Sequence, residues 1–440
     1  MKRSAYKLLT DWKKSANRKP LLVQGARQVG KTFLINEFGN REYSQFISLN
    51  FEQDKKLQSL FEKSLAPETI INNISLYIGK QIVPDDTLLF FDEIQAAPLV
   101  LTSLKYFYEH APEFHIIAAG SLLGVSIGKD NSFPVGKVNF MNLYPMSFLE
   151  FLNASGEDLL EKKLNKITTP EPLAEIVHHK LLDLLKLYFY LGGMPEVVAN
   201  YLENKNIEMI RVLQNEILKA YQRDFSKYAQ KSQAIKTMEF WNSIPGQLAK
   251  ENKKFKYAEI RKGARSAMFE QTTEWLKGAG LINMVYHLTT PKKPLLAYTD
   301  YSKFKVYLHD VGLLGAMLNI TSDLIVSPDQ LFKEFNGAFI ENFVTQELLS
   351  YGQEKQFYWT SRGEAEVDFI IDSFKGIYPV EVKSGTNRNL KSLRSYADKY
   401  RPDIIYRLSP RNIIQSGDFI NLPLYAVNVL INIIGHKSAL

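Results

Sequence analysis

The chain has 440 residues and a net charge of +7, and 45% of its residues are apolar. This composition is typical of a folded protein of about two to four domains, and no apolar stretch reaches the roughly eighteen residues that a membrane-spanning helix needs. The start, Met1–Ser4, lacks the apolar core of a secretory signal, and cysteine is absent, which excludes disulfides and cysteine-based metal sites and favours a reducing cytoplasm.

A phosphate-binding loop is predicted between a short strand and a helix. The apolar run Leu21–Gln24 ends at a glycine, and the residues that follow it, GARQVGKT, match the pattern GxxxxGK[ST]. Glycines let the backbone approach phosphate oxygens, and the next helix offers unpaired N–H groups. An ordinary glycine-rich turn is the alternative. We predict ATP binding by Gly25, Ala26, Arg27, Gln28, Val29, Gly30, Lys31, Thr32 and Phe33.

The chemistry of hydrolysis can be assigned to four side chains. Lys31 is expected to hold the β- and γ-phosphates, and Thr32 is expected to place its hydroxyl on Mg²⁺. Thr87–Phe91 reads as a buried strand that ends in Asp92 and Glu93. Because parallel strands present their C-terminal ends to the ligand, both acids should face the loop. We predict that Asp92 binds Mg²⁺ and that Glu93 orients or activates the attacking water.

Two further strands complete the predicted sheet. Phe46–Asn50 and His115–Ser121 are apolar runs on either side of the Thr87 strand in the sequence. Strands that alternate with helices predict an α/β fold with a doubly wound parallel sheet. Ser121 would sense the γ-phosphate from the end of its strand, or it would instead cap the helix that follows.

These segments, with two later ones, resemble a known family. GARQVGKT, FFDEIQAAP, AAGSLL, NLYPMSFLEF and GGMPEVV, in that order, are similar to prokaryotic AAA-type ATPases (AAA+ superfamily) that carry a C-terminal PD-(D/E)XK nuclease-like domain. The resemblance covers nearly the whole chain. It implies an AAA-type P-loop domain over residues 1–155 and a helical lid over residues 156–235. The turn Gly192–Pro195 would belong to this lid, which closes over the nucleotide, although a plain helix terminator would have the same composition.

The family pattern also indicates which residue would serve as an arginine finger, an arginine that stabilises the transition state of hydrolysis. The family usually has a Gly-Arg pair where this chain has Gly136 and Lys137. Lysine lacks the planar fork of donors that an arginine presents to a transition state. Arg223 is therefore an alternative candidate for the finger.

A winged helix-turn-helix is predicted over residues 236–310. Helical periodicity in 237–250, 257–260 and 266–279 is followed by two extended runs, 281–288 and 295–299. Between Lys250 and Asp310 there are twelve Lys or Arg and six Asp or Glu, which leaves +6 of the net charge in this segment. Such modules hold DNA phosphates with Lys and Arg, and Arg261, Lys262 and Arg265 precede the third helix. Interdomain packing is the alternative role.

Residues 311–440 contain a cluster of acids that predicts a nuclease-like domain. Glu341 interrupts an apolar helix, Asp368 lies inside an apolar strand, and Glu381 lies on the next extended run, which Lys383 follows. Buried acids are costly unless they are paired or bound to metal. We predict that Glu341, Asp368 and Glu381 bind Mg²⁺, while Glu381 and Lys383 act in catalysis. The alternative is a nuclease-like fold that binds without cutting and whose acids serve only in salt bridges.

The sequence therefore predicts an ATP-hydrolysing, DNA-associated AAA-type ATPase that uses ATP and Mg²⁺, with a Mg²⁺-dependent nuclease activity as an open question. An ATP-regulated switch that binds DNA or a protein partner without cutting is the alternative. No membrane partner is expected, and a homo-oligomer is compatible with the sequence, which does not fix the oligomeric state.

Overall fold

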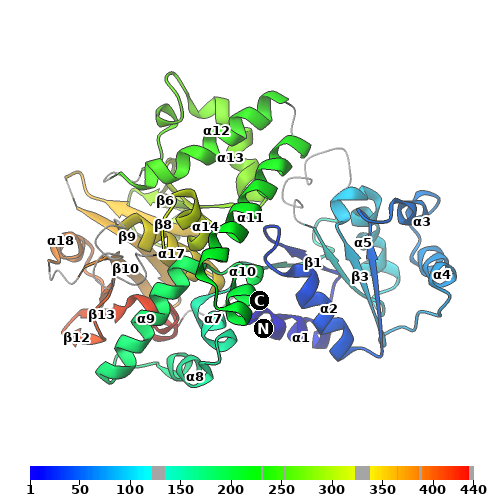
Figure 1. Cartoon of the computed structure of the whole chain (residues 1–440), viewed down its shortest axis with the longest axis horizontal. Coiled ribbons are helices and arrows are strands. Elements are labelled where there is room, and N and C mark those ends of the chain that lie inside the picture. The colour runs from blue at the N-terminus through cyan, green and yellow to red at the C-terminus, as the bar shows by residue number, and fades with distance from the viewer. Residues whose placement is uncertain are drawn as a thin grey trace. The chain divides into compact units, whose positions relative to one another are not determined.

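The structure is a computed structural model that describes residues 1–120, 134–228, 231–250, 254–322, 337–363, 365–385 and 389–435. The chain divides into two compact units, each with its own sheet (Figure 1). The N-terminal unit contains residues 2–144 and 274–281, and the C-terminal unit contains residue 1 and residues 145–273 and 282–440. Across the described ranges, no helix is long and apolar enough to cross a membrane.

The sheet of the N-terminal unit is entirely parallel. Its five strands follow the order β2-β3-β4-β1-β5, and each neighbouring pair is parallel. The prediction of an α/β fold with a parallel central sheet is therefore confirmed. The strands are β1 (Leu21–Gln24), β2 (Gln45–Asn50), β3 (Thr87–Asp92), β4 (His115–Ala119) and β5 (Asn139–Asn142).

Helices cover both faces of this sheet (Figure 1). Every residue of β3 is buried, as expected for a strand that packs on both sides. Leu89 and Phe91 belong to one core cluster with Ile70, Val100 and Leu104 of the helices on that face. The helices of this unit are α1 (Ala5–Lys14), α2 (Lys31–Glu42), α3 (Ser59–Glu62), α4 (Pro67–Ile78) and α5 (Pro98–His110), with short 3-10 turns η1 (Lys55–Gln58) and η2 (Ile94–Ala96).

The sheet of the C-terminal unit is mixed and has eight strands. Their order is β12-β13-β11-β10-β9-β8-β6-β7, and β6 pairs antiparallel with β7 and parallel with β8. The first predicted wing strand, β6, and its partner β7 thus belong to the sheet that carries the predicted nuclease-like residues. The strands are β6 (Ile282–Leu288), β7 (Thr299–Leu308), β8 (Gln356–Thr360), β9 (Glu366–Ser373), β10 (Gly376–Val382), β11 (Ile405–Ser409), β12 (Ile414–Ser416) and β13 (Phe419–Pro423).

The second wing strand was predicted in the wrong place. Residues 295–299 were expected to be extended, but Leu295–Tyr298 form the 3-10 turn η4, and the strand runs over Thr299–Leu308. The Ala297 N–H donates to the Pro294 carbonyl at 3.0 Å and closes this turn, while Leu295 is buried in a core cluster. The apolar run therefore reflects burial of a turn, which periodicity alone does not separate from a short strand.

Helices surround the C-terminal sheet. The predicted helices of residues 237–250 and 266–279 are present as α12 and α13, and residues 257–259 form only a 3-10 turn, η3. The helices are α7 (Phe148–Ala154), α8 (Asp158–Lys166), α9 (Glu175–Leu191), α10 (Pro195–Asn204), α11 (Ile207–Tyr228), α12 (Lys231–Leu248), α13 (Ser266–Gly278, whose residues fall in both units), α14 (Val311–Met317), α17 (Gly337–Ser350), α18 (Lys391–Tyr400) and α19 (Val427–Ile434).

The Gly192–Pro195 turn between α9 and α10 packs on a buried carboxylate. The Gly193 N–H donates to Asp310 Oδ2 at 2.6 Å, and Asp310 Oδ1 also accepts from the Leu313 N–H at the start of α14. Gly192 has a φ of +72°, and a Cβ built there would lie 2.2 Å from Asp310 Oδ1. Burial raises the pKa of Asp310 to about 6, and the hydrogen bonds from these backbone N–H groups partly oppose the increase. Gly192 is thus needed for the close approach to Asp310, whereas a Cβ at Gly193 would lie 2.2 Å from the carbonyl oxygen of Met146.

Candidate functional site

The loop that was predicted to bind phosphate has the backbone that such a loop requires. Gly25 has a φ of +143°, and a Cβ there would lie 2.2 Å from the carbonyl oxygen of Leu143. Gly30 adopts the left-handed conformation at the N-cap of α2, with a φ of +93°. Since neither conformation suits a residue with a Cβ, the two glycines of the motif fix the path of the loop. The unpaired N–H groups of the first turn of α2 begin directly after it.

Lys31 is buried within this loop, with 8% of its surface exposed. Its ammonium donates to the carbonyl oxygens of Gly25 and Ala26, both at 2.8 Å. Burial lowers the pKa of Lys31 to about 8, and the carboxylates of Glu93 and Asp92 partly oppose this shift. The loop's own carbonyls therefore hold a positive charge beside the start of α2, where a phosphate would bind.

Oxygen donors lie together at the carboxyl ends of two neighbouring strands. Thr32 Oγ1 donates to Asp92 Oδ2 at 3.0 Å, and Asn50 Nδ2 lies 3.5 Å from the same oxygen. Burial raises the pKa of Asp92, and Glu93 adds to the increase. A hydroxyl and a carboxylate in contact fit the oxygen coordination that Mg²⁺ prefers. Asn50 was not predicted, although the parallel register that aligns it with Asp92 follows from the sheet.

Glu93 holds a strained backbone conformation directly after β3. Its φ is +54°, in the left-handed region that costs a residue with a Cβ about 1–3 kcal/mol. Its Oε2 accepts a hydrogen bond from Gln95 Nε2, and the side chain is half-buried. Strain of this kind persists where the surrounding structure fixes it, and it is frequent at functional positions. The conformation sets the direction of the carboxylate that was predicted to act on water.

The remaining residues that were predicted to lie around the nucleotide differ in their exposure and in their ion pairs. Arg27 forms an ion pair with Glu52 at 3.7 Å, and the side chain of Phe33 is 61% exposed. Ser121 lies outside the described residues. Of the two candidates for an arginine-finger role, Lys137 pairs with Glu109 at 3.1 Å, and Arg223 is exposed on α11. Neither role is tested by these contacts.

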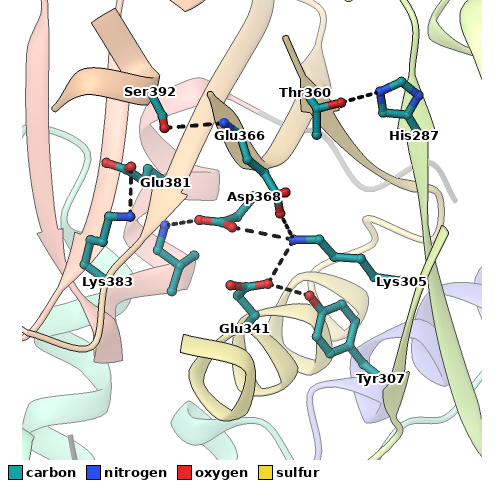
Figure 2. A network of polar contacts seen from close by, with 11 residues as sticks. His287, Lys305, Tyr307, Glu341, Thr360, Glu366, Asp368, Glu381, Lys383 and Ser392 are labelled. Carbon is teal, nitrogen blue, oxygen red and sulfur yellow. Dashed lines mark hydrogen bonds and ion pairs between the residues drawn. The ribbon is translucent and has the colours of Figure 1, made fainter. Parts of the chain in front are cut away.

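The C-terminal sheet brings the predicted acids of this unit close together (Figure 2). Asp368 on β9 and Glu381 on β10 lie on neighbouring antiparallel strands, and Asp368 Oδ2 accepts from the Val382 N–H at 2.8 Å. Glu341 faces them from α17, and all three acids are buried. Lys383 follows Glu381 at the end of β10. The residues that were predicted from the sequence thus come from α17, β9 and β10 and lie in one region of the unit.

A lysine that was not predicted lies at the centre of this cluster. Lys305 Nζ is 3.1 Å from Glu341 Oε2, 2.5 Å from Glu366 Oε1 and 3.6 Å from Asp368 Oδ1. Burial lowers the pKa of Lys305, but the carboxylates, Glu341 foremost, raise it well above its usual value. Lys305 is one of the twelve basic residues that were counted between Lys250 and Asp310, but its side chain is fully buried among acids and cannot face DNA.

Glu381 has other cationic partners. Its Oε1 lies 3.0 Å from Lys383 Nζ, and its Oε2 accepts from the Arg407 guanidinium at 3.4 Å. Tyr307 donates to Glu341 at 2.6 Å. Each acid of the cluster therefore contacts a cationic side chain of the protein, and the four acids, Glu366 included, share three cations. Within the described ranges, no group of three or more His, Asp or Glu side chains is arranged to hold a metal ion. The Mg²⁺ role of these acids stays a prediction.

The basic residues ahead of α13 are exposed. Arg261, Lys262 and Arg265 all lie at the surface, as do Ser266 and Ala267 at the start of the helix. Arg261 pairs with Glu239 at 3.1 Å. Other lysines of this segment also have acidic partners, as in the pairs Lys250–Glu259 and Lys303–Asp300. Lys262 and Arg265 are exposed beside Arg261 and contribute positive charge to the surface ahead of α13.

Comparisons with known proteins cover three parts of the chain. Residues 17–152 match a family described as an AAA domain. Residues 182–324 and 336–432 match two domains of unknown function, DUF8612 and DUF4143. No curated protein matches the chain.

Three solved structures are similar at low identity. A Walker-type ATPase of Pyrococcus abyssi matches with 16% identity and a TM-score of 0.43, covering 72% of this chain and 95% of that chain. The ORC1 protein of Aeropyrum pernix in complex with DNA matches with 12% identity and a TM-score of 0.30, covering 72% and 90%. Drosophila ORC bound to DNA matches with 15% identity and a TM-score of 0.28, covering 76% and 94%. The family match and the loop geometry agree that residues 17–152 form an AAA domain with a P-loop.

Proposed function

We propose that the chain binds ATP together with Mg²⁺ and hydrolyses it at the loop of residues 25–32. The observation that carries this proposal is the contact between Thr32 and Asp92, next to the buried ammonium of Lys31. A hydroxyl, a carboxylate and a lysine at the start of a helix are the groups that P-loop enzymes use to bind a nucleoside triphosphate with its cation.

Each side chain has a separate part in this proposal. Lys31 exchanges the carbonyls of Gly25 and Ala26 for phosphate oxygens when ATP binds. Thr32 and Asp92 hold Mg²⁺, which neutralises charge on the phosphates when it is bound. Glu93 orients the attacking water and accepts its proton. Asn50 holds the Asp92 carboxylate in position from the neighbouring strand.

Nucleotide binding and turnover measured on the full chain test this assignment. Lys31→Ala should abolish ATP binding in calorimetry, because the phosphates lose their cationic partner. Glu93→Gln should keep binding but lose turnover, because an amide does not accept the proton of water. Glu62→Gln makes the same change at an exposed position on α3 and should have no effect. An unchanged turnover in Glu93→Gln would contradict the role given to that carboxylate.

The second part of the proposal is that the ATPase acts in association with DNA. Support comes from the exposed side chains of Arg261, Lys262 and Arg265 at the start of α13. Basic residues that precede an exposed helix are suited to contact phosphates while the helix approaches a groove. Because phosphate contacts carry no sequence information by themselves, this surface supports binding to DNA in general.

For the C-terminal unit, the geometry favours the non-cutting alternative over a Mg²⁺-dependent nuclease. Glu341, Asp368 and Glu381 are each paired with cationic side chains of the chain itself, as the salt-bridge alternative expects. Cleavage assays on single-stranded, duplex and branched DNA, with Mg²⁺ or Mn²⁺ and with or without ATP, test this choice. We expect no activity above that of Asp368→Ala. Cleavage that Asp368→Ala removes would establish the nuclease instead.

A further inference from the structure

One ammonium group occupies the centre of the carboxylate cluster formed by Glu341, Glu366 and Asp368. The group belongs to Lys305 of β7, a strand that does not neighbour β9 in the sheet. Its Nζ contacts oxygens of all three acids, at 3.1, 2.5 and 3.6 Å respectively (Figure 2). Two elements, α17 and β9, therefore present their acids to a single cation that a third element supplies.

The Lys305 ammonium is fully buried, so it must lie where charged partners surround it. The side chain of Lys305 is 0% exposed, and that of Glu341 is 2% exposed. Desolvation of an isolated charge costs several kcal/mol, so a buried ammonium is retained only where acids and hydrogen bonds surround it. Tyr307 donates to the same Glu341 oxygen that Lys305 contacts. The ammonium and the acids therefore depend on one another.

The second oxygen of Asp368 and the neighbouring Glu381 are also bound by groups of the protein. The second oxygen of Asp368 accepts the Val382 N–H, and Glu381 is bound to Lys383 and Arg407. A divalent ion would require Asp368 and Glu381 to direct free oxygens at one point. In Figure 2, Glu381 instead lies beside Lys383, apart from the group around Lys305.

We propose that the ammonium of Lys305 is the resident cation of this cluster and takes the place that a divalent metal would occupy between Glu341 and Asp368. The cluster then serves as a fixed ionic core of the C-terminal unit, and it binds no metal while Lys305 is present. Removal of the ammonium, with the acids kept, creates the metal site.

Binding of Mn²⁺ to the nucleotide-free full chain tests this proposal, with free Mn²⁺ measured by electron paramagnetic resonance. Wild type and Asp368→Asn should bind the same number of Mn²⁺ ions. Lys305→Met, which keeps the length of the side chain, should gain one site with an affinity about 10- to 100-fold above any background. Adding Asp368→Asn to Lys305→Met should remove that site.

A second variant covers the case in which Lys305→Met does not fold, since it leaves three acids without their cation. Lys305→Met combined with Glu366→Gln keeps Glu341 and Asp368, two carboxylates that can contribute to holding such an ion beside its bound waters. Mn²⁺ should raise the thermal unfolding temperature of this double variant by more than it raises that of wild type. Two results would overturn the proposal: a Mn²⁺ site in wild type that Asp368→Asn removes, or a folded double variant that binds no more Mn²⁺ than wild type.

Discussion

The hydroxyl of Thr32 donates to the carboxylate of Asp92 across 3.0 Å, and this contact joins the start of α2 to the end of β3. The two residues are far apart in the sequence, and only the parallel sheet brings them together. Because both are oxygen donors, a cation bound there would contact the loop that holds phosphate and the strand that carries Glu93. The contact thus connects the proposed nucleotide site to the carboxylate of Glu93, which we propose activates water.

Two substitutions at Thr32 should distinguish the effect of losing its hydroxyl from the effect of changing the shape of its side chain. Thr32→Ser keeps the hydroxyl and should retain Mg²⁺-dependent ATP hydrolysis. Thr32→Val keeps the shape and should raise the Mg²⁺ concentration for half-maximal turnover about 10- to 100-fold, the range for loss of one contact that supports a metal. Hydrolysis rates measured across a Mg²⁺ titration distinguish the two. Equal Mg²⁺ dependence in both variants would remove Thr32 from the cation site.

Lys31 should make the stability of the nucleotide-free protein depend on pH. The pKa of its ammonium falls from 10.5 to about 8 because burial disfavours the charge. Between these values the unfolded chain binds more protons than the folded one, so stability rises with pH. The full difference corresponds to about 3 kcal/mol.

Lys31→Met removes this titration and supplies the comparison. Urea unfolding at a series of pH values from 7 to about 10.5 should show wild type gaining free energy of unfolding relative to Lys31→Met, chiefly above pH 8. Other groups titrate alike in both proteins and cancel in the difference. A constant difference across this range would show that the folded environment does not disfavour the charge on Lys31.

Substitution of Asp310 should strongly lower the stability of the C-terminal unit. Asp310→Ala leaves the N–H groups of Gly193 and Leu313 buried without their acceptor. Each such loss costs about 1–3 kcal/mol, so we expect a decrease of at least about 2 kcal/mol in the free energy of unfolding. Asp183→Ala, at an exposed position on α9, should cost less than about 0.5 kcal/mol. Similar unfolding midpoints for the two variants would exclude this role for Asp310.

The loop and the strand of the proposed nucleotide site could be predicted because their signals are local. The loop motif specifies a backbone that only glycines at positions 25 and 30 allow, and β3 is a continuous apolar run that ends in two acids. What the sequence could not show is the neighbour that the sheet supplies. Asn50 contacts Asp92 through strand pairing, and that pairing depends on strand order.

The C-terminal cluster shows the limit of local reasoning more clearly. Glu341, Asp368 and Glu381 were identified because acids inside apolar segments are unusual. Lys305 entered the prediction only as one of twelve basic residues between Lys250 and Asp310, and its neighbours Phe304 and Val306 do not set it apart from the others. Its burial follows from how the sheet and α17 pack around β7, which no spacing in the sequence encodes.

The exposed basic residues ahead of α13 lead to a prediction about DNA binding. Replacing Arg261, Lys262 and Arg265 together by Glu should weaken binding to all DNA sequences alike, because phosphate contacts are independent of sequence. A matched control changes Lys162, Lys163 and Lys166 of α8 to Glu, which alters the net charge of the same unit equally. The control keeps the overall electrostatic effect and leaves the surface around α13 intact.

Salt dependence separates a specific contact surface from general attraction. Each phosphate contact that is lost should reduce the slope of log affinity against log salt by about 0.9. Filter binding at several salt concentrations should therefore show a slope that is shallower by about 2–3 for the α13 triple variant. The α8 variant should bind somewhat more weakly at low salt but keep the wild-type slope. If both variants keep the wild-type slope and affinity, the helices of residues 237–279 serve in packing, and the proposed association with DNA must be assigned to another surface or abandoned.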